Sequence, residues 1–410
     1  MKRGAVSFHT SPSGIRMVHM SVPGCSVGYC GVAVRVGSRD EDVSCHGLAH
    51  FVEHTIFKGT ARRRSWHIIN RMEAVGGELN AFTTKEETVV FSAFPSGNLS
   101  RAADLIADLI TSSQFPAREL EKDREVVADE IDSYLDSPAD AVFDDFEDLL
   151  FAGSRLGHNI LGNRGALAGF SSELCREYLR RWYVPANIVV FYAGAWAEKR
   201  VFSVLEKAFG GVAGQAPDVD RPIPQVVGPF DIVKEIDSHQ CHTVMGARVG
   251  SMFSPDRYAV ALLTNILGGP GMNSLLNIAL RERRGLVYSV DASTAVFSDC
   301  GALAIYYGCD PHDNRKCRGI VKEIVGSVAD GYLTPRRLDA AKKQYLGQTV
   351  LAGENVENRI ISIARHHLFN DTILTRAQMI DAVKSVSPAD ISRIAASLNL
   401  SSLTLGPASD

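Results

Sequence analysis

Apolar and polar residues follow two periods in the first half of the chain. A two-residue alternation, or a run rich in β-branched residues, predicts a strand, and recurrence at three and four positions predicts a helix. Four strands are predicted on this basis: GIRMVHMSV (14–22), VGYCGVAVRV (27–36), GELNAF (77–82) and ETVVFSAF (87–94). Helices are predicted at 47–59, at 65–75, over 96–112 and from Pro116 onwards.

The second half of the chain repeats this order. Gly, Pro and Asp are concentrated from Gly210 to Phe230, which predicts a linker over 212–229. A strand, two helices and two more strands follow, and helices are predicted from Pro335 to the end of the chain. We therefore expect an α+β protein with two homologous domains, 1–211 and 230–410, each a mixed β-sheet covered by helices.

Composition excludes several classes of function. The 410 residues carry a formal net charge of -4, so there is no electrostatic footprint for nucleic acid. No apolar run approaches about 18 residues, and the N-terminus lacks the apolar region of a secretory signal, so no membrane partner is expected. The eight cysteines form no C-x-x-C pair, which predicts free thiols and a cytoplasmic location.

The candidate chemistry lies in GLAHFVEHTIFKG, residues 47–59. In a helix, His50 and His54 are one turn apart and project from the same face, and Glu53 falls between them. Two imidazoles and a carboxylate that converge in this way suit a zinc ion with a base beside it. A pair of histidines on a helix is often only polar surface. Here apolar residues go nearly all round the helix, so it is expected to be buried, and buried imidazoles need partners.

A third ligand can come from the helix that begins near Pro116. Asp123 and Glu130 lie two turns apart along one edge of its apolar stripe, whereas the other acids of this segment face elsewhere. Either carboxylate is therefore a reasonable ligand. The alternative, in which all six acids between 121 and 132 solvate a surface helix, stays open on periodicity alone.

Six sequence blocks in order carry a resemblance to a known family. The chain resembles the pitrilysin-type (inverzincin) zinc metallopeptidases, and among them the short two-domain bacterial members similar to the mitochondrial processing peptidase subunits. The blocks are GSRDE (37–41), GLAHFVEHTIFKGT (47–60), GGELNAFTTKEET (76–88), REVVADEI (124–131), YVPANIVV (183–190) and LRERRGLVYSV (280–290).

The resemblance implies roles for the residues of the metal motif. His50 and His54 would bind one zinc ion per chain, and Glu53 would be the general base that takes a proton from a water activated by the zinc. Glu130, 76 positions after His54, matches the third ligand of the family. Asp123 stands where the family usually has Glu, and would support the ligands by hydrogen bonding without binding the metal itself.

The resemblance also implies how substrate is bound and cleaved. A substrate-binding edge strand would be formed by Leu79, Asn80, Ala81 and Phe82. Arg281 and Tyr288 match a pair that grips the substrate, and Tyr288 would donate to the developing oxyanion. The chain would then form half of a clamshell, as a homodimer or in a heterodimer. It would be an endopeptidase that cleaves unfolded peptides inside a closed chamber, and the alternative is a non-catalytic peptide-binding scaffold of the same fold.

Overall fold

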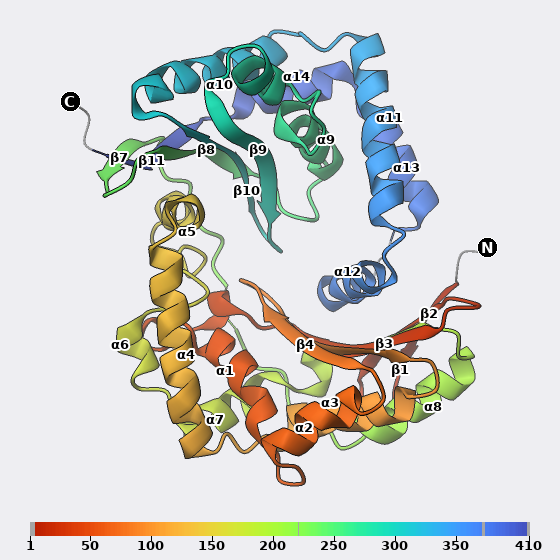
Figure 1. Ribbon diagram of the computed structural model, residues 1–410. Helices are drawn as coiled ribbons and strands as arrows, with labels where there is room; N and C mark the ends of the chain where they lie inside the picture. The colour runs from red at the N-terminus through yellow and green to blue at the C-terminus, as the bar shows by residue number, and fades with distance from the viewer. Residues whose placement is uncertain (1–4, 220, 371–373, 408–410) are drawn as a thin grey trace. The chain divides into compact units, whose positions relative to one another are not determined.

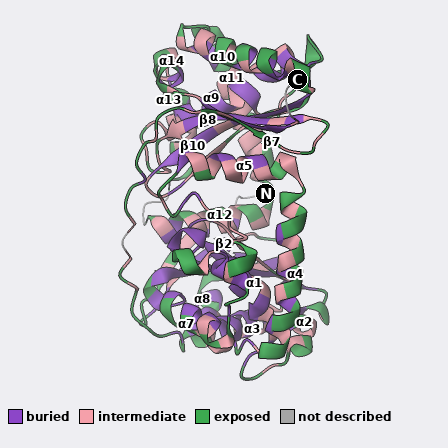
Figure 2. Ribbon diagram, turned by 90° about the vertical axis from the view of Figure 1, so that its left-hand side faces the viewer, coloured by how far each residue is buried: buried purple, intermediate pink, exposed green. Residues whose placement is uncertain are grey.

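A computed structural model describes residues 5–219, 221–370 and 374–407 of the chain. These residues form two compact units, each built around one β-sheet. The central strands of each sheet are largely buried, the edge strands are partly exposed, and the helices are buried on one side and exposed on the other (Figure 2). Among these residues, no helix is both long enough and apolar enough to cross a lipid bilayer.

The first unit contains a six-stranded mixed sheet in the order β1-β2-β6-β3-β5-β4. Figure 1 labels β1, β2, β3 and β4 of this sheet. Its strands are β1 (Val6–Thr10), β2 (Arg16–Ser21), β3 (Val27–Val34), β4 (Glu78–Thr83), β5 (Thr88–Pro95) and β6 (Ile188–Gly194). The pair β2 and β6 is parallel and the other pairs are antiparallel. Strand β4 pairs only with β5 and so forms one edge of the sheet.

Helices cover both faces of this sheet. The helices of the unit are α1 (Leu48–Thr55), α2 (Ser65–Glu73), α3 (Leu99–Ser112), α4 (Ala117–Leu135), α6 (Arg164–Leu167), α7 (Ser172–Trp182), α8 (Glu198–Phe209) and α12 (Val356–Phe369). One face packs against a large apolar core to which α1, α3, α7 and α8 contribute. The other face packs against Ile360, Ala364 and Leu368 of α12, which belongs to the second half of the sequence.

The second unit has a five-stranded mixed sheet in the order β7-β11-β8-β10-β9. Its strands are β7 (Asp231–Glu235), β8 (Cys241–Val249), β9 (Val287–Val296), β10 (Gly301–Cys309) and β11 (Ser401–Gly406). Its helices are α5 (Pro138–Leu150), α9 (Arg257–Gly268), the π-helical segment η5 (Asn277–Glu282), α10 (Asn314–Ala329), α11 (Pro335–Ala352), α13 (Arg376–Ser385) and α14 (Pro388–Ser397).

The two sheets share one topology. The order β2-β6-β3-β5-β4 in the first unit corresponds, strand by strand, to β7-β11-β8-β10-β9 in the second, including the single parallel pair. The prediction of an α+β protein with two homologous domains is therefore confirmed.

The two halves of the sequence also exchange one helix each. Helix α5, from the first half, covers a face of the second sheet through Val142, Phe146 and Leu150, as α12 covers a face of the first. Gly246 of β8 permits this close packing, because a Cβ there would lie 2.9 Å from the Phe146 ring.

Candidate metal centre

The short helix α1 presents two histidines on one face. Leu48, Phe51 and Val52 are buried in the core of the first unit, which fixes the rotation of the helix about its axis. His50 and His54 then lie one turn apart, with their ring centroids 4.5 Å apart at an interplanar angle of 65°. The predicted helix and its shared histidine face are thus present.

Helix α4 brings Glu130 to these two rings. Its Oε2 lies 3.4 Å from Nε2 of His54 and 3.8 Å from Nε2 of His50. Zinc binds imidazole and carboxylate at about 2.0–2.2 Å, so tetrahedral ligand atoms are separated by roughly 3.3–3.5 Å. The distance to His54 matches this spacing, and the distance to His50 is a few tenths of an ångström longer. In the described part of the chain these three residues are the only cluster of its kind that could hold a metal ion.

The electrostatics of His50 also suit metal binding. Its side chain is buried, and this burial, with the neighbouring His54, lowers the pKa of His50 to about 4. The imidazole is therefore neutral at pH 7, which is the form that binds a metal. The donor set fits a zinc ion in type, number and spacing.

Glu53 lies on α1 with His50 and His54, and its carboxyl group is also near Glu130 of α4. Burial raises the pKa of its carboxyl group, the nearby carboxylate of Glu130 adds to this rise, and Thr83 and His54 oppose it. Thr83 is the last residue of β4, so Glu53 lies between the metal ligands and the edge strand. A carboxyl group with a raised pKa is suited to take up a proton and give it away again.

Asp123 lies on the inward face of α4, two turns before Glu130. Its Oδ1 accepts a hydrogen bond from Nζ of Lys58 at 2.7 Å. Its Oδ2 is buried and has no hydrogen-bond partner among the described residues, and the same is true of Nδ1 of His50. Asp123 thus ties α4 to the segment that follows α1, and its role as a support for the ligands stays a prediction.

The predicted substrate strand is the exposed edge of the first sheet. Strand β4 contains Leu79, Asn80, Ala81 and Phe82. Oδ1 of Asn80 accepts a hydrogen bond from the backbone N–H of Ala81 at 2.9 Å. This N–H therefore points away from β5, in the direction from which a further strand would pair.

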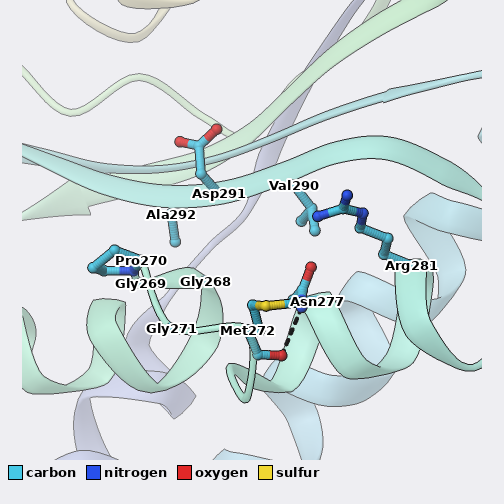
Figure 3. Close-up of a pocket in the computed structure, with 10 residues that line it drawn as sticks. All are labelled: Gly268, Gly269, Pro270, Gly271, Met272, Asn277, Arg281, Val290, Asp291 and Ala292. Atoms are coloured by element: carbon cyan, nitrogen blue, oxygen red, sulfur yellow. Dashed lines mark hydrogen bonds between the residues drawn. The ribbon is translucent and has the colours of Figure 1, made fainter. Parts of the chain in front are cut away.

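Arg281 and Tyr288 lie in the second unit. Arg281 is exposed in η5 and lines a pocket of about 330 Å³ with Asp291 of β9 and the glycine-rich turn 268–271 (Figure 3). Tyr288 is 57% exposed on β9, and its hydroxyl donates to Oδ1 of Asp310 at 2.8 Å. The two residues are thus accessible to a ligand.

Two residues with a clear place at the site were missed from the sequence. Glu41 accepts hydrogen bonds from the first turn of α1, and Lys58 pairs with Asp123. Both residues lie in sequence blocks that carry the resemblance, GSRDE and GLAHFVEHTIFKGT. The resemblance therefore marked these positions, but no role was assigned to either residue.

The fold and the site together define a class, an α+β protein of two similar units with a His-His-Glu cluster that could hold a metal ion. The family model described as "Insulinase (Peptidase family M16)" matches residues 16–164, and the model "Peptidase M16 inactive domain" matches residues 169–345. Uncharacterized zinc proteases are similar over most of the chain. One from Streptomyces coelicolor is 31% identical over 96% of this chain and 87% of its own length. One from Mycobacterium tuberculosis is 34% identical over 88% of this chain and 83% of its own length.

Solved structures share the fold. A protease from Helicobacter pylori superposes with a TM-score of 0.89 at 21% identity, and covers 98% of this chain and 100% of its own. A peptidase M16 inactive domain from Pseudomonas fluorescens gives 0.90 at 16% identity, over 99% and 98% of the two chains. The chain belongs to peptidase family M16, as a short member with one copy of each of the two domains.

Proposed function

We propose that this protein is a zinc-dependent endopeptidase that cleaves unfolded peptides. The observation that carries the proposal is the convergence of His50, His54 and Glu130, with Glu53 beside them. The three ligands would hold one zinc ion per chain. When bound there, zinc would polarise the scissile carbonyl and lower the pKa of a water molecule.

The protein's own residues account for the remaining steps. Strand β4 would pair with an extended peptide by strand addition, which reads the peptide backbone more than its side chains and so suits unfolded substrates. Glu53 would accept the proton of the attacking water and pass it to the leaving amine. Tyr288 would donate to the developing oxyanion, and Arg281 would hold the peptide.

The chain carries both the metal ligands and the Arg281 and Tyr288 pair, so it need not borrow either from a different subunit. We therefore infer a homodimer that encloses its substrate in a chamber. All eight cysteines are free thiols, which supports a reducing compartment, the cytoplasm. Size measurement on the purified protein tests the dimer, and a heterodimer subunit would remain a monomer without cleavage activity.

Two substitutions test the catalytic proposal. Glu53→Gln removes the proton acceptor and leaves the three ligands, so zinc content should stay at one ion per chain while cleavage of a fluorogenic peptide library is lost. Glu130→Ala should lower zinc content, whereas Glu125→Ala, at an exposed position of the same helix, should leave it unchanged.

The opposite results would reject specific parts of the proposal. Unchanged turnover in Glu53→Gln would reject the assigned base, and full zinc in Glu130→Ala would place the third ligand elsewhere. A wild-type protein that binds zinc and peptides without cleaving them would be the non-catalytic scaffold.

A further inference from the structure

The buried carboxyl group of Glu41 contacts the start of the helix that carries two of the proposed metal ligands. Its Oε1 accepts a hydrogen bond from the backbone N–H of Ala49 at 2.7 Å, and its Oε2 accepts one from the N–H of Gly47 at 2.8 Å. Gly47 is the N-cap residue of α1 and has no side chain with which to cap the helix. Glu41, six residues earlier in the chain, therefore supplies the cap.

The segment that carries Glu41 is fixed in place by buried charges. The side chain of Arg39 donates to Glu86 at 2.6 Å, and the guanidinium of Arg221 donates to both oxygens of Asp40 at 2.8 Å. Gly37, at the start of the segment, packs so closely that a Cβ there would lie 2.1 Å from a backbone oxygen of the neighbouring turn. The carboxylate of Glu41 thus has little freedom to move.

The other side of the helix start is also restrained. Nε2 of His158 lies 3.1 Å from Oε2 of Glu41, and the ring of His158 stacks on His46 at a centroid distance of 3.7 Å. Gly47 has a φ of +96°, and a Cβ there would lie 2.5 Å from the backbone oxygen of Leu161. The first turn of α1 is therefore held between Glu41 and the loop around His158.

We propose that Glu41 is a positioning residue of the metal centre. By binding two amides of the first turn, it fixes the direction in which α1 presents His50 and His54 to Glu130. His50 directly follows Ala49, so a shift of that turn moves its imidazole. The inference rests on the proposed function, because it treats these three residues as zinc ligands.

The isosteric variant Glu41→Gln separates this role from packing. Glutamate offers one oxygen to each of the two N–H groups, whereas glutamine offers one oxygen and one amide nitrogen. In either orientation of the amide, one helix N–H faces an NH₂ group and loses its acceptor. The volume of the side chain is unchanged, so an effect on the metal site comes from the lost hydrogen bond.

Glu87→Gln is the matched control. Glu87 is 1% exposed and Glu41 is 3% exposed, and both carry a buried carboxyl group. Glu87 forms an ion pair with Arg365, with Oε1 and Nε 2.9 Å apart, and not a contact with the backbone of α1. The same substitution at this position therefore removes a buried carboxyl group without removing an acceptor from the helix start.

The test measures zinc affinity by competition with a chelator, and kcat and KM for a fluorogenic peptide at saturating zinc. Glu41→Gln should bind zinc about tenfold or more weakly, as is typical when a group that orients metal ligands is removed. Its kcat should fall while KM is retained, because β4 is not touched by Glu41. Glu87→Gln should keep wild-type zinc affinity.

A second, milder variant covers the case in which Glu41→Gln does not fold. His158→Phe keeps the ring stacked on His46 and removes the nitrogen that faces Glu41, so it should weaken zinc binding in the same direction by a smaller factor. The inference would be overturned if the variant that folds, Glu41→Gln or His158→Phe, bound zinc as tightly as the wild type. It would also be overturned if Glu87→Gln weakened zinc binding as much as Glu41→Gln does. If the wild-type protein binds no zinc, the proposed function is wrong, and the inference about Glu41 fails with it.

Discussion

The ion pair between Lys58 and Asp123 joins the two chain segments that supply the proposed metal ligands. Lys58 ends the short helix η3 (Ile56–Lys58), which continues directly from α1, and Asp123 lies on α4 two turns before Glu130. Nζ and Oδ1 are 2.7 Å apart, and the side chains are 31% and 7% exposed, respectively. Lys58→Met removes the charge and keeps most of the apolar stem.

The magnitude follows from this geometry. At 2.7 Å the attraction between two unit charges is about 1.5 kcal/mol in water and about 6 kcal/mol at an effective dielectric constant of 20. Removing one partner of a buried pair costs about 3–5 kcal/mol. Because Lys58 is partly exposed and Oδ2 of Asp123 already lacks a partner, we expect Lys58→Met to lower the free energy of unfolding by about 2–3 kcal/mol.

A double-mutant cycle with Asp123→Asn measures the pair directly. Urea unfolding of the zinc-free protein gives the stability, and chelator competition gives the zinc affinity. Asp123→Asn should cost much less in the Lys58→Met background than in the wild type, with a coupling of about 2 kcal/mol. Additive losses, or wild-type stability of Lys58→Met, would refute the idea that this pair holds α1 and α4 together.

Three further predictions concern other parts of the chain. Burial raises the pKa of Glu87 to about 7 in the folded protein, so Glu87 keeps its proton there at pH values at which the unfolded chain has lost it. The free energy of unfolding of the wild type therefore falls as pH rises from about 4.5 to 7. Glu87→Gln lacks this loss, so its free energy of unfolding should rise by about 2–3 kcal/mol relative to the wild type over that range. Parallel pH profiles in urea unfolding would contradict this. Tyr288→Phe, which loses only an exposed bond to Asp310, should keep its thermal stability and lower kcat about 100-fold, and an unchanged kcat would remove Tyr288 from catalysis. Gly47→Ala should cost at least about 2 kcal/mol in urea unfolding, because it combines a left-handed φ with a clash against Leu161, and a near-neutral effect would show that the helix start can shift.

The sequence alone predicts how two of the three residues of the candidate metal site are placed. His50 and His54 follow from helical spacing, because the period of the helix places them on one face regardless of the rest of the fold. Glu130 is harder, since periodicity turns both Asp123 and Glu130 inward without saying which neighbour each one meets. The structure brings Glu130 to the histidines and pairs Asp123 with Lys58, and this difference depends on how α4 crosses α1.

The exchange of α5 and α12 could not be read from their order in the chain. Both helices carry apolar residues at positions i, i+4 and i+8, which predicts one buried stripe in each. This pattern does not indicate which of the two sheets a helix covers, because that depends on tertiary packing. Strand β11 was missed for a related reason, because a short C-terminal segment becomes a strand by pairing with β7 and β8.

The length of α1 explains why groups that do not bind the metal matter to this site. The helix has eight residues, and isolated helices shorter than about 12 residues are marginal in water. Its geometry must therefore be imposed from outside. Glu41 binds its N-terminal amides, Lys58 ties the chain beyond its C-terminus to α4, and Phe51 is buried in the core between these ends. The sequence H-x-x-E-H at residues 50–54 thus supplies two of the proposed zinc ligands, and the acceptor at position 41 and the cation at position 58 hold the helix that presents them.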